Sequence, residues 1–141
     1  MSRVQADMES LLAWLSTYPQ WNRFGQVRCE SPSHTGLLPK SAEETSRQED
    51  LSGNCRVGCR YTVSLFWQMD GAESDEDNAA RLLDFQNWVR EQSVCGLAPQ
   101  FGDEPLLERI RATKGGFTAN VQTVTYTVTL VADFMKVYEV N

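Results

Sequence analysis

Histidine is almost absent from this sequence, since His34 is the only one among 141 residues. Serine and cysteine nucleophiles usually need a neighbouring histidine as general base, and most catalytic zinc sites use two or three histidines. The sequence also lacks the phosphate-binding motifs G-x-x-x-x-G-K-[ST] and G-x-G-x-x-G and the nucleophile motif G-x-S-x-G. We therefore expect no catalytic residues and predict a protein that is not an enzyme.

Paired cysteines are also missing. The four cysteines stand at positions 29, 55, 59 and 95, and no two of them form a C-x-x-C pair. If Cys55 and Cys59 share a strand, they lie about 13 Å apart, which is too far for a disulfide or a common metal ion. The acidic stretch DGAESDED, residues 70–77, lacks the spacing of a calcium-binding loop. We expect reduced thiols, no metal site and no cofactor.

Long apolar runs and an excess of basic residues are absent too. No run of apolar residues is long enough to span a bilayer, and the N-terminus does not resemble a secretory signal. Lysine and arginine number 13 against 19 acidic residues, which gives a formal net charge of −6. A negative charge disfavours binding to nucleic acid. We expect a chain made in a cytosol that binds neither a membrane nor a specific nucleic-acid sequence.

Two segments of the sequence alternate between apolar and polar side chains, as a strand with one buried face does. The first is residues 56–69. The second lies within residues 107–140, which predict a long C-terminal β-hairpin with its turn at Gly115-Gly116. Its second arm, residues 120–135, would be about 53 Å long. Such a strand must bend, carry a bulge or reach a neighbouring subunit.

The two faces of this second arm differ in chemistry. One face is predicted to lie in the core, and it consists of Val124, Tyr126, Val128, Leu130, Ala132 and Phe134. The opposite face carries Thr123, Thr125, Thr127 and Thr129. Phe66 falls on this polar sheet face by strand parity, and an exposed aromatic side chain is typical of an interface. We therefore select Phe66 and the four threonines as candidate interface residues.

Two further segments place apolar side chains at helical spacing. Residues 3–18 follow Ser2, and residues 75–94 follow Ser74. Each serine precedes a Gln or an Asp by three residues, which resembles a capping box. The tryptophans at positions 14, 21, 67 and 88 lie in or beside apolar stripes, so we expect them to pack in the core rather than bind bases or sugars.

The remaining part of the N-terminal half is less patterned. Residues 24–30 and 36–39 predict two short strands. Residues 41–54, SAEETSRQEDLSGN, contain one large apolar residue and end in Ser-Gly-Asn, which favours a long loop. We treat this segment as a candidate acidic loop, whose carboxylates belong to Glu43, Glu44, Glu49 and Asp50.

The order of these elements predicts an α+β fold. We expect a mostly antiparallel sheet of four to five strands, with two helices packed on one face and the long hairpin at the C-terminal end. With no internal repeat and no linker, residues 1–141 are expected to form a single domain.

Four stretches of the chain carry a more specific pattern of residue type and order. They are an amphipathic helix that ends in aromatic residues, MESLLAWLSTYPQW; a polar turn that leads into a strand, LSGNCRVGCRYTVSLFWQM; a helix with a Leu-x-x-Phe-x-x-Trp-Val core, NAARLLDFQNWVREQ; and a closing hairpin, LERIRATKGGFTANVQTVTYTVTLVADFMKVY. Together they cover most of the chain and resemble the tail terminator, or tail-completion, proteins of bacteriophages and prophages, often filed as minor capsid proteins. The segment 41–54 is more acidic and polar than that family's pattern.

The resemblance implies a structural virion protein that has no enzymatic activity. Such proteins form a ring, typically a hexamer, that caps the tail tube and joins it to the head connector. The implied partners are further copies of the chain, the tail-tube protein and the head-tail connector protein. The implied location is the virion tail, after assembly in the bacterial cytoplasm. The alternative that the residues leave open is a small cytosolic adaptor module that binds other proteins.

Overall fold

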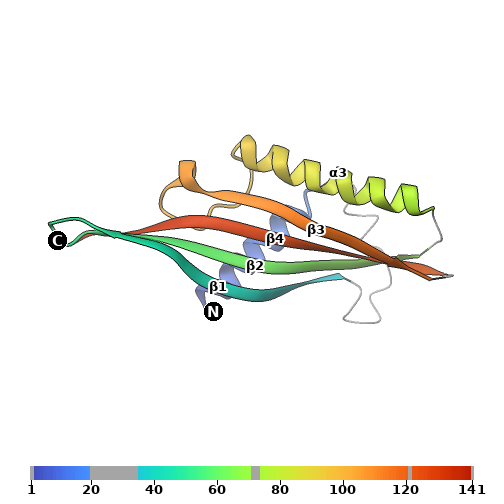
Figure 1. The fold of residues 1–141 in the computed structure, drawn as a ribbon, viewed down its shortest axis with the longest axis horizontal. Coiled ribbons are helices and arrows are strands. Elements are labelled where there is room, and N and C mark those ends of the chain that lie inside the picture. The colour runs from blue at the N-terminus through green and yellow to red at the C-terminus, as the bar shows by residue number, and fades with distance from the viewer. Residues whose placement is uncertain (1, 20–34, 71–73, 121, 141) are drawn as a thin grey trace.

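The computed structural model describes residues 2–19, 35–70, 74–120 and 122–140 of the chain (Figure 1). Within them the chain forms four antiparallel strands in the order β1-β2-β4-β3, together with two α-helices and one short 3-10 helix. In chain order these elements are α1 (Arg3–Leu15), β1 (Thr35–Glu49), β2 (Cys55–Asp70), α3 (Asp75–Val94), η1 (Pro105–Leu107), β3 (Arg109–Ala119) and β4 (Thr123–Tyr138). The predicted α+β class is confirmed.

Both helices pack on the same face of the sheet. In Figure 1, α1 lies behind the strands and α3 runs along the β3 side. The alternation seen in the sequence explains this arrangement, because the alternate apolar residues of β2 and β4 share one face and the helices cover it. The predicted core set of β4, from Val124 to Phe134, is buried as expected.

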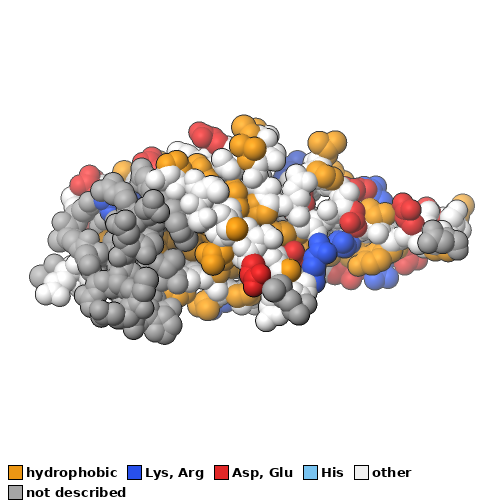
Figure 2. Space-filling model, turned by 180° about the vertical axis from the view of Figure 1, so that it is seen from behind, with side chains coloured by type: hydrophobic (Ala, Val, Ile, Leu, Met, Phe, Trp, Pro, Cys, Tyr) orange, Lys and Arg blue, Asp and Glu red, His pale blue; other side chains and the backbone are white. Residues whose placement is uncertain are grey.

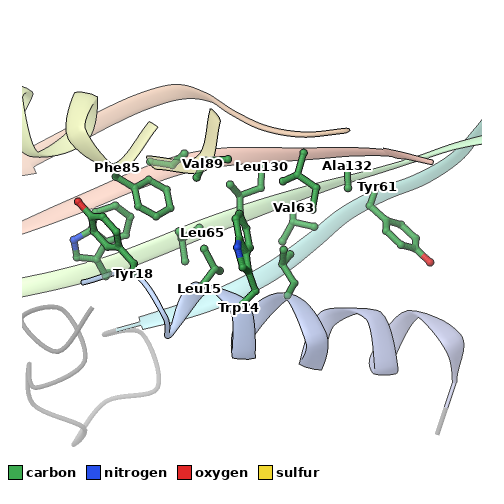
Figure 3. Packing of buried hydrophobic residues seen from close by; sticks show 14 of the residues in the cluster. Trp14, Leu15, Tyr18, Tyr61, Val63, Leu65, Phe85, Val89, Leu130 and Ala132 are labelled. Carbon is green, nitrogen blue, oxygen red and sulfur yellow. The ribbon is translucent and has the colours of Figure 1, made fainter. Parts of the chain in front are cut away.

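Aromatic side chains form the centre of the core, as Figure 3 shows. Phe85 of α3 is fully buried, and its ring centroid lies 5.3 Å from that of Tyr18 and 5.5 Å from that of Trp67. Trp14 of α1 stacks on Trp88 of α3 at 5.0 Å. These contacts join the two helices to each other as well as to the sheet. The expectation that Trp14, Trp67 and Trp88 pack in the core is confirmed, while Trp21 lies outside the described residues.

The helix boundaries follow from serine caps. Ser2 and Gln5 form the reciprocal capping box at the start of α1. The hydroxyl of Ser74 accepts a hydrogen bond from the amide of Asp77 at the start of α3, whose predicted range, 75–94, is confirmed. Helix α1 ends at Leu15, three residues earlier than predicted, and the chain continues in turns through Tyr18.

Strand β4 pairs with β2 over its whole length. The pairing runs without a bulge from Thr123 opposite Asp70 to Tyr138 opposite Cys55. The sixteen residues of β4 are therefore matched by the sixteen of β2 within one chain. The sheet extends beyond the helices at the end that carries the β1–β2 hairpin (Figure 1).

The turn of the C-terminal hairpin is not where the sequence predicted it. Gly115 and Gly116 lie inside β3, and the chain reverses after Asn120, whose side-chain oxygen accepts hydrogen bonds from the amides of Gln122 and Thr123 at 2.9 and 2.8 Å. The amide end of the Gln86 side chain lies against Gly115, where a Cβ would be 2.2 Å from Nε2 of Gln86 and would displace that flexible side chain. The residue with positive φ is Lys114, at 53°, beside a register shift of the strand.

The predicted loop at residues 41–54 is wrong over most of its length. Strand β1 extends from Thr35 to Glu49, and only residues 50–54 form a turn. The short strand expected at 36–39 is thus the beginning of a fifteen-residue strand. Two register shifts with β2 fit bulges into β1. At the second, Thr45 and Ser46 crowd over Gly58, where a Cβ would lie 2.8 and 2.5 Å from their hydroxyl oxygens. The strand predicted at 24–30 lies outside the described residues.

Replacing Phe85 with alanine should strongly destabilise the fold. The change opens a cavity among the aromatic rings that join α3 to β2 and α1. We expect the free energy of unfolding to fall by about 3–5 kcal/mol, measured by urea denaturation. Leu83→Ala is the matched control, because Leu83 lies on the same helix and is 58% exposed, and it should change stability by less than about 0.5 kcal/mol. Similar losses in the two variants would contradict this packing.

Candidate functional site

The most buried charged group of the described residues is Asp7 of α1. Its carboxylate accepts hydrogen bonds from the hydroxyl of Tyr61 at 2.8 Å and from Nε of Arg3 at 3.3 Å. Burial, followed by the contact with Asp7, raises the pKa of Tyr61 above its ordinary value. Arg3 also donates to the carbonyl oxygen of Phe101. This network joins α1 to β2 and to the segment before η1, which is a structural role.

Glu108 holds the same segment from the other side. Its carboxylate accepts hydrogen bonds from the amides of Phe101 and, at 3.2 Å, Gly102. Burial raises the pKa of Glu108, and the two amide hydrogen bonds oppose that rise. Phe101 is thereby held in the core, where it contacts Tyr61 and Phe134. The carboxylate is occupied in positioning this segment of backbone.

Nucleophiles and metal ligands do not gather into a site in the described part of the chain. No group of three histidine, cysteine or acidic side chains there could hold a metal ion. Cys55 and Cys59 lie on one strand, β2, as expected, and are partly buried free thiols, while Cys95 is free and exposed. Cys29 and His34 lie outside the described residues.

The candidate interface residues lie on the sheet face opposite the helices. The threonines of β4 pair with the polar positions of β2, for example Thr127 with Phe66 and Thr129 with Ser64. No helix or strand of the described residues covers this face, which we call the open face. Thr127 is exposed, and Thr123, Thr125 and Thr129 are partly exposed.

Phe66 has a structural partner within the chain. It is partly buried, and a Cβ on Gly36 would lie 2.8 Å from its ring. The ring therefore covers Gly36 on the neighbouring edge strand, β1, in the way that aromatic residues often shield strand glycines. Phe66 lies on the open face, as its parity predicted, but part of its surface is already used to hold β1.

Charged residues lie at the β3 side of the open face. Asp133 of β4 binds Nε of Arg60 at 2.6 Å, and Arg111 approaches the same carboxylate at 3.8 Å. Arg109 pairs directly with Asp133 in the strand register. Two arginines therefore approach one carboxylate and a third lies opposite it in the register, while Glu43 lies opposite Arg60 on β1, so three arginines face two acids in a protein whose formal net charge is −6.

The four carboxylates of the predicted acidic loop do not form one cluster. Glu43, Glu44 and Glu49 are exposed on β1, and only Asp50 lies in the turn. Arg47 pairs with Glu44 at 3.0 Å and with Glu49 at 3.4 Å. The narrow end of the molecule consequently carries charges of both signs (Figure 2).

A groove lies between the C-terminal end of α3, η1 and the start of β3. It has a volume of about 580 Å³ and includes Val94, Leu106, Arg90, Arg109 and Arg111. The two apolar residues are 81% and 95% exposed. Sequence reasoning missed this groove, because its residues come from three elements that only the fold brings together.

Comparisons with known proteins gave no relative from which the fold or the site could be interpreted. We found no family model, no curated protein and no solved structure that matches the chain significantly. In the part of the chain that the structure describes, neither helix is long and apolar enough to cross a bilayer.

The raised pKa of Glu108 gives a prediction about stability and pH. Because the folded state favours the protonated acid, the contribution of Glu108 to stability is greatest below its ordinary pKa of 4.5 and declines as the pH rises through the raised pKa. The variant Glu108→Gln removes this titration. We expect the free energy of unfolding of the wild type, relative to the variant, to fall as the pH rises above 4.5. Urea denaturation at a series of pH values tests it, and a relative stability that rises with pH would contradict it.

Proposed function

We propose that this chain is a structural subunit of a bacteriophage or prophage tail that assembles into a ring, caps the tail tube and joins it to the head connector. The observation that carries the proposal is the one-sided architecture: both helices cover one sheet face, and the other face remains polar and uncovered by the described residues. The order of elements also agrees with the four stretches that resemble tail terminators. The virion tail and its tube and connector proteins are part of the same proposal.

The edges of the sheet favour association through faces and projecting parts rather than through added strands. Edge strand β1 carries Pro39, Lys40 and two register shifts, all of which hinder pairing with another strand. On edge strand β3, the amide of Ile110 already donates to the hydroxyl of Ser93 at 3.2 Å. The open face carries no such feature that hinders contact with another protein, so it is the surface most suited to bind a protein partner.

A ring imposes a further requirement that this molecule meets. Closed rings use heterologous contacts, in which two different surfaces of the subunit meet. The chain offers such a pair of surfaces: the β1–β2 hairpin at one end, and the groove beside η1. The negative net charge also suits a channel through which DNA must pass without binding.

The open face can be tested on β4. Thr127 is exposed, and although it lies opposite Gly116, its hydroxyl would still be 3.7 Å from a Cβ at that position, so the contact is loose and Thr127→Arg should leave the fold intact. We expect the variant to weaken capping of the tail tube by about tenfold or more, because it places an unpaired charge in a contact surface. Mass photometry and negative-stain microscopy would measure ring formation, and the length of tubes grown from a tail-tube protein would measure capping.

The matched control for this experiment is Asn87→Arg, which adds the same charge at an exposed position of α3. It should assemble as the wild type does. Normal rings and normal capping by Thr127→Arg would show that the open face is not an assembly surface. A wild-type protein that forms rings but leaves tube length unchanged would contradict the tail role and favour the adaptor alternative.

A further inference from the structure

The tip of the β1–β2 hairpin presents a single leucine to solvent. Leu51 is fully exposed, and it lies between Asp50 and Ser52 in the turn that joins the two strands. Residues 44–54 around it carry three acids, Glu44, Glu49 and Asp50, against one basic residue, Arg47, which pairs with Glu44 and Glu49, so the tip keeps a net negative charge. Leu51 contributes nothing to the core of its own chain, and exposed Val140 lies beside Gly53 of the same turn.

This tip is rigid rather than loosely connected. One carboxylate oxygen of Asp50 accepts hydrogen bonds from the amides of Ser52 and Asn54, at 2.9 and 3.0 Å. These bonds lower the pKa of Asp50, so the group stays charged at neutral pH. The side chain of Asn54 in turn accepts a hydrogen bond from the amide of Val140 at 2.9 Å. Leu51 is therefore held in place before any partner binds, which reduces the entropy lost on binding.

The groove beside η1 has the complementary properties. Val94 and Leu106 are apolar and largely exposed, and the three arginines of the groove add positive charge. Glu108 also lines the groove, where its carboxylate accepts hydrogen bonds from the amides of Phe101 and Gly102, and Arg111 lies 3.8 Å from Asp133; with three arginines against these two acids, the groove keeps a net positive charge. The groove thus combines an apolar contact with a cationic border.

We propose that the hairpin tip of one copy inserts Leu51 into this groove of a second copy, with Glu49 and Asp50 facing Arg109 and Arg111. The contact cannot form within one chain, because β2 is held along β4 to its end and the tip lies beyond the C-terminal end of α3 (Figure 1). The inference rests on the proposed ring and assigns its subunit contact.

The opposite charges of the tip and the groove favour binding of a second copy in head-to-tail orientation. Two acidic tips repel each other, and so do two arginine-bordered grooves, whereas a tip and a groove attract. A contact of this kind is heterologous and repeats around a ring. One hairpin tip buries less area than a stable dimer needs, but ring closure gives every copy two such contacts. Assembly should therefore depend on concentration and weaken as salt is added.

Two variants test the two halves of the contact separately. Leu51→Asp alters the tip and Leu106→Asp alters the groove, and both residues are almost fully exposed, so the fold should be retained. Leu83→Asp makes the same change at an exposed site of α3 outside the groove. We expect the first two variants to weaken self-association by about tenfold or more, as measured by analytical ultracentrifugation, and the third to behave as the wild type.

Mixing the two weakened variants gives the decisive measurement. The Leu51→Asp chain keeps an intact groove and the Leu106→Asp chain keeps an intact tip, so the mixture can form one good contact and no more. Because a single contact is weak, we expect a heterodimer in the mixture at high protein concentration, monomers of each variant alone at the same concentration, and larger assemblies of the wild type. An isologous contact, in which the same surface of two copies meets, would not give this result.

The outcomes separate this inference from the proposed function. If the wild type forms rings and both variants form them equally well, the tip-to-groove contact is wrong while the ring remains. If the mixture gives the heterodimer but the wild type does not cap tail tubes, the contact is correct and the tail function is wrong. A wild type that stays monomeric at every concentration and salt level would overturn both.

Discussion

The continuous pairing of β2 with β4 is the constraint on which the rest of this structure depends. Sixteen residues of each strand face each other without a bulge. Their apolar positions are therefore aligned on one side along the whole ladder, and a slip by one residue would move all of them to the other face. The helices have one apolar surface on which to pack, and the edge strands are added on either side of an already specified centre.

The same pairing explains why the molecule has two unlike ends. Helices cover the part of the sheet where the aromatic rings are concentrated, and beyond Tyr61 and Phe134 the strands continue without a helix above them. The extension contains the charged β1–β2 hairpin, whose strands are stabilised by backbone pairing and ion pairs rather than by a core. A rigid projection of this kind can carry a contact away from the body of the subunit.

The sequence predicted those elements in which buried and exposed side chains alternate in a regular pattern. Strands β2 and β4 and helix α3 each have one buried side, so their period is visible in the residues. Strand β1 was predicted as a loop over most of its length, because the side chains of its residues 41–49 are exposed on both sides and show no alternation. Their strand conformation depends on pairing with β2. Gly115 was misread as a turn because its contact with Gln86 is made with a helix that is distant in the sequence. The candidate interface residues were placed correctly by parity, whereas the groove joins three elements and has no signature in the sequence.

The hydrogen bond from the amide of Val140 to the side chain of Asn54 ties the C-terminal segment to the hairpin turn. Val140 thus lies beside Gly53 and Asn54 of that turn. A purification tag or a fluorescent protein fused at the C-terminus would thus start next to the hairpin tip, whereas a fusion before Ser2 would start at α1, on the covered side of the sheet. The choice of terminus for a label consequently decides whether the projecting end of the subunit remains accessible.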